Sequence, residues 1–79
     1  MTNENELLKR IEVNANVLAG KPIVRGYRIS VEQIVKSLAA GWTTADVLKN
    51  FPELNEQDIL ACLMYAGKLL EDEKIYKVA

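Results

Sequence analysis

The order of apolar and polar positions changes along the chain, and two periods can be recognised. Residues 11–14 alternate apolar and polar, and apolar residues lie on both sides of Gly26. Alternation is typical of short half-buried strands, and a glycine between two extended pieces indicates a turn. We therefore predict a β arm over residues 11–29, outside the core. Pro22 places part of it at a sheet edge, because proline cannot donate a ladder hydrogen bond.

From residue 30 onward the apolar positions follow helical spacing instead. Three polar residues, Ser30, Thr43 and Asn55, each stand where a side chain can cap the first turn of a helix. Ser30 is followed three residues later by Gln33, which suits a capping box. The sequence predicts three helices, over residues 30–40, 43–50 and 55–74.

The length of 79 residues, with 49% hydrophobic and 27% charged residues, is that of one small globular domain. We expect a polar N-terminal tail over residues 1–10, a single domain over residues 11–74 and a C-terminal tail over residues 75–79. No apolar run approaches the ~18 residues of a membrane span, and residues 1–6 are unlike a signal peptide. A cytoplasmic protein that does not enter a membrane is the expectation.

The composition argues against an enzyme. The chain has no histidine and one cysteine, which removes the commonest general base and excludes a zinc site built from thiolates and imidazoles. Cys62 stands in an apolar stretch and is interpreted as a packed, inert thiol. Gly20 and Lys21 lack the spacing of a phosphate-binding loop. We expect no catalytic residue, no metal ligand and no cofactor.

Charge is distributed unevenly, although the net charge is only -1. Residues 20–36 carry a net charge of +3, whereas residues 53–73 carry -5. A basic segment of this kind can contact phosphates, and a strongly acidic one is repelled by them. The two segments therefore favour different partners.

The third predicted helix has more apolar positions than a small core can bury. One stripe is formed by Ile59, Leu60, Leu63, Met64, Gly67 and Leu70, and we expect it to face the core. A second stripe is covered either by the β arm or by a partner, and self-association as a homodimer is the favoured alternative. The interface candidates are this second stripe and two residues of the tail: Cys62, Tyr65, Ala66, Leu69, Ile75 and Tyr76.

The second and third predicted helices, with a short connection between them, have the lengths of a helix-turn-helix. Glu56 and Asp58 oppose DNA binding, because they place carboxylates at the start of the recognition helix. The basic groups lie on the arm instead. The candidates for DNA contact are Lys21, Arg25, Arg28, Lys36, Thr43, Thr44, Asn55 and Gln57. The alternative is that these side chains are simply solvated.

The stretch from Gly20 to Ile29 resembles a motif of the bacterial family named domain of unknown function 433. That family has Gly-Lys-Pro, an apolar residue, and then Gly-Thr-Arg-Ile. The motif residues here are Gly20, Lys21, Pro22, Gly26 and Arg28, and Tyr27 replaces the usual threonine. Phe51-Pro52-Glu53-Leu54 and Tyr65-Ala66 support the resemblance, which covers roughly residues 11–70.

The resemblance implies a mainly α fold, with a homeodomain-like three-helix core and an N-terminal β arm. It also implies a protein that is often dimeric and serves as an antitoxin beside a ribonuclease of the PIN type. Such a ribonuclease holds Mg²⁺ with carboxylates, which an inserted Arg25 or Arg28 would neutralise. Two functions therefore stand side by side: an antitoxin-like DNA-binding regulator, and a protein-interaction module that uses the same scaffold without binding DNA.

Overall fold

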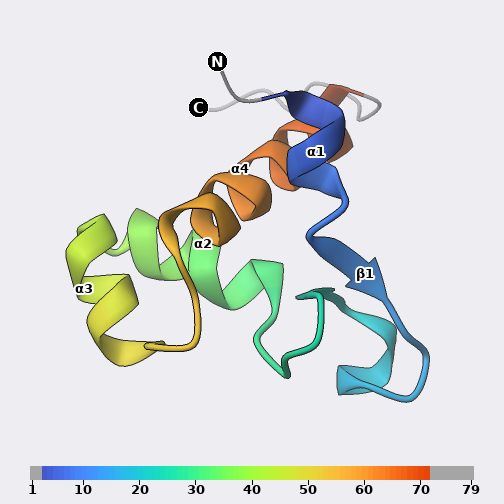
Figure 1. Ribbon diagram of the computed structural model, residues 1–79, viewed down its shortest axis with the longest axis horizontal. Helices are drawn as coiled ribbons and strands as arrows, with labels where there is room; N and C mark the ends of the chain where they lie inside the picture. The colour runs from blue at the N-terminus through green and yellow to red at the C-terminus, as the bar shows by residue number, and fades with distance from the viewer. Residues whose placement is uncertain (1–2, 72–79) are drawn as a thin grey trace, which may run out of the picture.

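The computed structural model describes residues 3–71, which form a mainly helical protein with one small antiparallel sheet (Figure 1). The sheet and the first helix precede a group of three longer helices. In chain order the elements are α1 (Glu4–Leu8), β1 (Ile11–Val13), the 3-10 turn η1 (Leu18–Gly20), β2 (Pro22–Val24), α2 (Val31–Ala39), α3 (Thr44–Asn50) and α4 (Glu56–Glu71). The predicted class, helices with a short β hairpin, is confirmed. Within the described residues, no helix is long and apolar enough to cross a membrane.

The three longer helices begin at the predicted caps. The Ser30 hydroxyl accepts a hydrogen bond from the backbone N–H of Gln33 at 3.0 Å. At α3, Thr43 and Asp46 form a reciprocal capping box, in which each side chain accepts from the other residue's backbone N–H. Asn55 and Asp58 make the same pair of contacts at the start of α4, at 3.0 and 2.9 Å. These caps satisfy backbone donors that have no partner within the helix.

The β arm is part of the core, contrary to the sequence-based expectation. Strands β1 and β2 pair with Ile11 opposite Val24, and Ile23 also bridges to Ser30. Ile23 and Val24 are only 2% and 1% exposed. Ile11 and Val24 of the hairpin belong to one core cluster with Ile34 of α2 and Val47 of α3, so the hairpin packs on the helices. The predicted turn lies at Gly26, whose φ of +87° suits glycine.

Residues 3–8 are not the predicted polar tail, because they contain helix α1. Asn3 caps this helix by accepting a hydrogen bond from the backbone N–H of Asn5, and Leu7 is buried in the core. Helix α1 lies against α4 (Figure 1), and Glu4 forms an ion pair with Lys68 at 3.5 Å. The first residues therefore cover one side of the longest helix.

The buried side of α4 differs from the predicted one. Ala61 and Cys62 are fully buried, whereas Leu63 and Leu70 of the predicted core stripe are 44% and 70% exposed. The reason is that α1 and α2 pack against the side that carries the small residues, where helices can approach closely. Ile59 is buried as predicted. The buried apolar residues are Leu7, Ile11, Ile23, Val24, Ile29, Val31, Ile34, Val47, Leu54, Ile59, Ala61 and Cys62.

Candidate functional site

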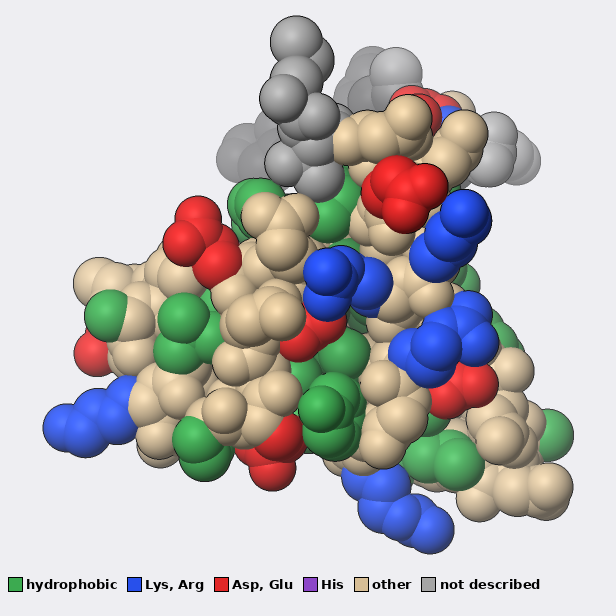
Figure 2. All heavy atoms as spheres, viewed as in Figure 1, with side chains coloured by type: hydrophobic (Ala, Val, Ile, Leu, Met, Phe, Trp, Pro, Cys, Tyr) green, Lys and Arg blue, Asp and Glu red, His purple; other side chains and the backbone are tan. Residues whose placement is uncertain are grey.

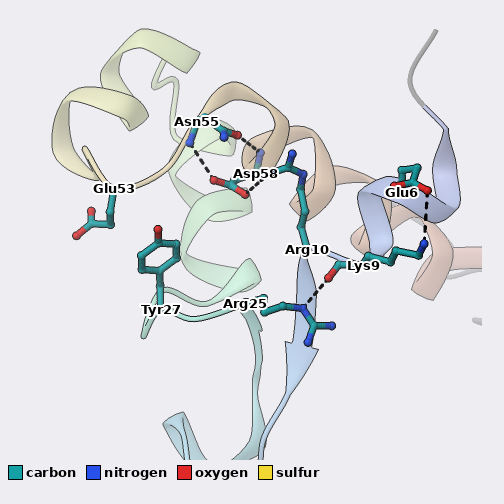
Figure 3. Close-up of a pocket in the computed structure, with 8 residues that line it drawn as sticks. All are labelled: Glu6, Lys9, Arg10, Arg25, Tyr27, Glu53, Asn55 and Asp58. Atoms are coloured by element: carbon teal, nitrogen blue, oxygen red, sulfur yellow. Dashed lines mark hydrogen bonds and ion pairs between the residues drawn. The ribbon is translucent and has the colours of Figure 1, made fainter.

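A polar hollow of about 440 Å³ lies where α1, the turn of the β arm and the α3–α4 loop meet (Figure 3). It brings together residues 6–10, 25–27 and 53–58, which are far apart in the sequence. All the side chains that line it are polar: Glu6, Lys9, Arg10, Arg25, Tyr27, Glu53, Asn55 and Asp58. Of the DNA-contact candidates, it contains Arg25 and Asn55.

The guanidinium of Arg25 is held in place by the backbone. Its Nε donates to the carbonyl oxygen of Lys9 at 2.7 Å, and its backbone N–H donates to the carbonyl oxygen of Arg10, also at 2.7 Å. Among residues 3–71, no carboxylate forms an ion pair with Arg25. The two Nη groups, on the other edge of the guanidinium, are therefore available to a ligand.

Arg10 and Asp58 form an ion pair at the base of the hollow. Arg10 Nη1 donates to Asp58 Oδ1 at 3.1 Å, and Asp58 Oδ2 accepts from the backbone N–H of Asn55. The side chain of Asp58 is only 9% exposed, compared with 39% for Arg10. Asp58 therefore caps α4 and ties that helix to the start of β1, which is why its carboxylate is buried with partners for both oxygens.

The hollow contains charges of both signs. Lys9, Arg10 and Arg25 are balanced by three carboxylates, and Lys9 lies 3.4 Å from the Glu6 carboxylate. Figure 2 shows basic side chains over α1 and the β arm, with acidic side chains beside them. Glu6, Lys9 and Arg10 were not predicted as site residues, because residues 1–10 were expected to form a polar tail. The apolar pair Leu7-Leu8 after Asn3 is the signal that would have revealed α1.

Two further DNA-contact candidates, Lys21 and Lys36, lie on another part of the molecule. They form ion pairs with Glu32, at 3.0 and 2.8 Å. Hydrogen bonds to Lys36 and then to Lys21 lower the pKa of Glu32 to about 2, and the pKa of Lys36 is raised by the same carboxylate. Glu32 thus offsets one of the four positive charges of residues 20–36, and the net charge of +3 already includes it.

The remaining candidates do not form one surface with these lysines. Thr43 and Asn55 use their side chains to cap α3 and α4. Arg28 and Thr44 are exposed, and Gln57 is half-buried. Among residues 3–71, Arg28 forms no ion pair. The eight candidates are therefore divided among several places on the surface.

The interface candidates on α4 separate into one buried residue and three surface residues. Cys62 does not reach the surface, because the core encloses it, so its assignment to an interface is corrected. Burial raises the pKa of its thiol to about 12. Tyr65, Ala66 and Leu69 line a mainly apolar groove of about 220 Å³, together with Pro22, Val31, Glu32 and Val35. Ile75 and Tyr76 lie outside the described residues.

The glycines and the proline of the motif in the β arm determine the backbone conformation around β2. Gly20 and Gly26 both have positive φ, of +80° and +87°, and Pro22 begins β2. Positive φ is unfavourable for other residues, so the two glycines shape the turns on either side of β2. Lys21 and Arg28 extend from these turns and are exposed.

These features define a small, mainly α-helical protein with a β hairpin closed over its core. The chain belongs to the family described as "Protein of unknown function (DUF433)", whose model matches residues 11–66. A solved DUF433 member from Anabaena variabilis is similar, with a TM-score of 0.76 and 27% sequence identity over 85% of this chain and 66% of that chain. Helix α1 precedes the segment that the family model matches.

One curated relative is similar in sequence. "Uncharacterized protein y4eO" of Sinorhizobium fredii (strain NBRC 101917 / NGR234) is 35% identical over 51 residues, which make up 65% of this chain and 23% of that protein. The chain thus spans less than a quarter of the length of that relative.

Proposed function

We propose that this chain is a non-enzymatic regulatory protein that acts by binding other proteins, and that it forms a homodimer through α4. The observation that carries this proposal is the exposure of three leucines on one helix. Leu63, Leu69 and Leu70 are 44%, 51% and 70% exposed. An apolar surface of this kind is expected where a second protein binds. The α4 apolar surface consists of Leu63, Tyr65, Ala66, Gly67, Leu69 and Leu70.

A second copy of the chain suits this surface. A two-fold axis perpendicular to α4 would pair the helix with itself in antiparallel orientation and would use the same surface on both copies, as an isologous contact requires. Such a pair opposes the two helix dipoles favourably and places the exposed Glu56 of the first turn toward the end that carries Lys68. A Cβ added at Gly67 would meet no atom within 4 Å, so a neighbouring backbone can approach there.

The test of the dimer is a measurement of mass in solution. Wild type should have twice the mass of one 8.9 kDa chain, and the variant Leu69→Glu should be monomeric because a carboxylate would be buried in the interface. Val13→Glu is the matched control, since Val13 is 59% exposed on β1. A monomeric wild type, or a Leu69→Glu variant that stays dimeric, would refute the role of α4.

An antitoxin is the regulatory role that the family resemblance implies. In this proposal Arg25 and Arg28, exposed on the turn of the arm, reach the Mg²⁺-binding carboxylates of a PIN-type ribonuclease. Co-expression with the product of the adjacent gene, followed by mass determination of the purified complex, tests this role. The double variant Arg25→Ala and Arg28→Ala should release toxicity, whereas a double variant that remains as tightly bound and as protective as wild type would contradict it.

DNA binding is the second candidate function. It is favoured by the pair α3 and α4, whose short connection resembles that of a helix-turn-helix. The carboxylates in the first turn of α4 and the pairing of Lys21 and Lys36 with Glu32 weigh against it. Gel-shift assays at ~50 mM salt with DNA from the chain's own promoter test it. Binding that weakens steeply with salt would support a DNA-binding regulator. An absence of binding would support a protein-interaction module that does not bind DNA.

A further inference from the structure

We propose that the polar hollow binds an extended segment of a partner protein, and that an acidic side chain of this segment pairs with Arg25. The inference rests on the proposed function as a protein-interaction module and names the chemistry of one partner. It concerns a different surface from the α4 apolar surface, because the hollow lies between α1, the arm turn and the α3–α4 loop with the first turn of α4 (Figure 3).

Arg25 has the geometry of a carboxylate receptor. The hydrogen bond from its Nε to the Lys9 carbonyl fixes the plane of the guanidinium. The Nη groups can then donate two parallel hydrogen bonds to one carboxylate. Because the side chain is already held by the fold, little further conformational entropy is lost when a ligand binds.

The balance of charge around the hollow favours a carboxylate over a phosphate. Two of its three basic residues are paired, Arg10 with Asp58 and Lys9 with Glu6. Among the described lining residues, the charged groups without an ion pair are then Arg25 and Glu53. A ligand with a single negative charge matches Arg25, whereas a doubly charged phosphate would be repelled by the acidic lining.

Glu53 and Arg25 lie on opposite sides of the hollow, with Tyr27 also on the side of Glu53 (Figure 3). A segment that carries one acidic and one basic side chain can therefore pair with both residues at once. The Tyr27 side chain, 39% exposed, offers a flat apolar face and a hydroxyl, which bind peptides at a low cost in conformational entropy. The volume of about 440 Å³ suits a few residues of an extended chain.

The experiment is a titration of the full-length ¹⁵N-labelled protein, followed by NMR. The probe is the peptide acetyl-Gly-Glu-Gly-Lys-amide, and the comparison peptide has glutamine in place of glutamate. We expect the first peptide to shift the Arg25 Nε–H, Gly26 and Tyr27 signals, with an affinity about tenfold higher than that of the second. Equal affinities, or shifts that are not localised to the hollow, would overturn the proposal.

Variants and a competing anion sharpen the test. Arg25→Gln should weaken peptide binding about tenfold, whereas Lys49→Gln, which removes a positive charge on α3 outside the hollow, should leave it unchanged. Similar losses in both variants would show non-specific attraction and would refute the site. Inorganic phosphate should not displace the peptide. Displacement at equal concentration would show that the hollow prefers a phosphate and would overturn the proposal of a carboxylate ligand.

The mass of the Arg25→Gln variant separates this inference from the proposed dimer. We expect the variant to remain dimeric, because Arg25 lies away from α4's apolar surface. Peptide binding by a protein that proves monomeric would refute the dimer alone. A dimer that does not distinguish the two peptides would refute the carboxylate site alone.

Discussion

Replacing Asp58 with alanine should destabilise the protein more than any other change to a helix cap described above. The carboxylate accepts hydrogen bonds from Arg10 Nη1 at 3.1 Å and from the backbone N–H of Asn55 at 2.9 Å. It is buried, with 9% of its side chain exposed. Alanine would remove both contacts and leave the partners beside an apolar methyl group.

The expected loss of unfolding free energy is about 2–3 kcal/mol. Removal of a capping side chain costs ~1 kcal/mol. Leaving partners without an acceptor costs a further ~1 kcal/mol, the low end of the usual range, because Asn55 is exposed and water can reach its N–H. The ion pair itself adds up to ~1 kcal/mol, since Arg10 is partly exposed. In a domain of this size the sum corresponds to a fall in Tm of about 10–20 °C.

The assay is urea unfolding followed by circular dichroism, with Asp46→Ala as the matched control. Asp46 occupies the same position in the capping box of α3, but it is exposed and lacks an ion pair within residues 3–71. Its replacement should lower the unfolding free energy clearly less, because the group is exposed and water can take the place of the carboxylate. The difference between the two variants isolates the contribution of burial and of Arg10.

Equal losses in the two variants would refute the reasoning, because the link from α4 to β1 would then contribute nothing. A double-mutant cycle with Arg10→Gln gives a second check. If Arg10 and Asp58 interact as described, the double variant should be less destabilised than the sum of the single variants. Strict additivity would show that the ion pair has no effect on stability.

Three further predictions concern residues elsewhere. Because the pKa of Cys62 is raised to about 12, its thiol should react with dithiobis(nitrobenzoate) at pH 8 far more slowly in the folded protein than in urea, and equal rates would contradict its burial. Two lysines lower the pKa of Glu32 from 4.5 to about 2, so the carboxylate stabilises the fold above about pH 4.5 and this contribution is lost as the pH falls toward 2; Glu32→Gln should flatten the dependence of Tm on pH in this window. Gly26→Ala should lower the unfolding free energy by about 1 kcal/mol in urea titrations, because φ is +87°, and an unchanged unfolding free energy would contradict this strain.

The starts of the three longer helices were predictable because the signals are local. Ser30, Thr43 and Asn55 each accept from a backbone N–H three residues away, so a short stretch of sequence contains both partners of each contact. The same holds for the turn at Gly26. The type and order of these elements therefore follow from short stretches of chain.

The buried side of α4 was not predictable in this way. Apolar residues occur around most of this helix, so periodicity does not distinguish Ala61 and Cys62 from Leu63 and Leu70. The choice depends on where α1 and α2 pack. Residues 4–8 were expected to be part of a tail. One of the two helices that determine which side of α4 is buried was therefore not predicted.

The candidate site, too, could be predicted only in part from local sequence patterns. Arg25 was predicted as a candidate functional residue from the charge of the arm. The hydrogen bond from its Nε to the Lys9 carbonyl could be seen only in the structure. The hollow itself arises from contacts between residues far apart in sequence, such as Arg10 with Asp58. Pairing over such separations is a tertiary effect that neither residue's neighbours indicate.

Trp42 follows Gly41 at the corner between α2 and α3, where its backbone N–H donates to the carbonyl of Ser37 at 3.1 Å. Its side chain is 37% exposed, and it is the only tryptophan in the sequence. Its fluorescence therefore reports on this corner, whereas far-ultraviolet circular dichroism averages over all the helices. Coincident transitions of the two signals in urea would show that the corner unfolds together with α1 and the arm. The chain thus contains a natural optical reporter of its own folding cooperativity.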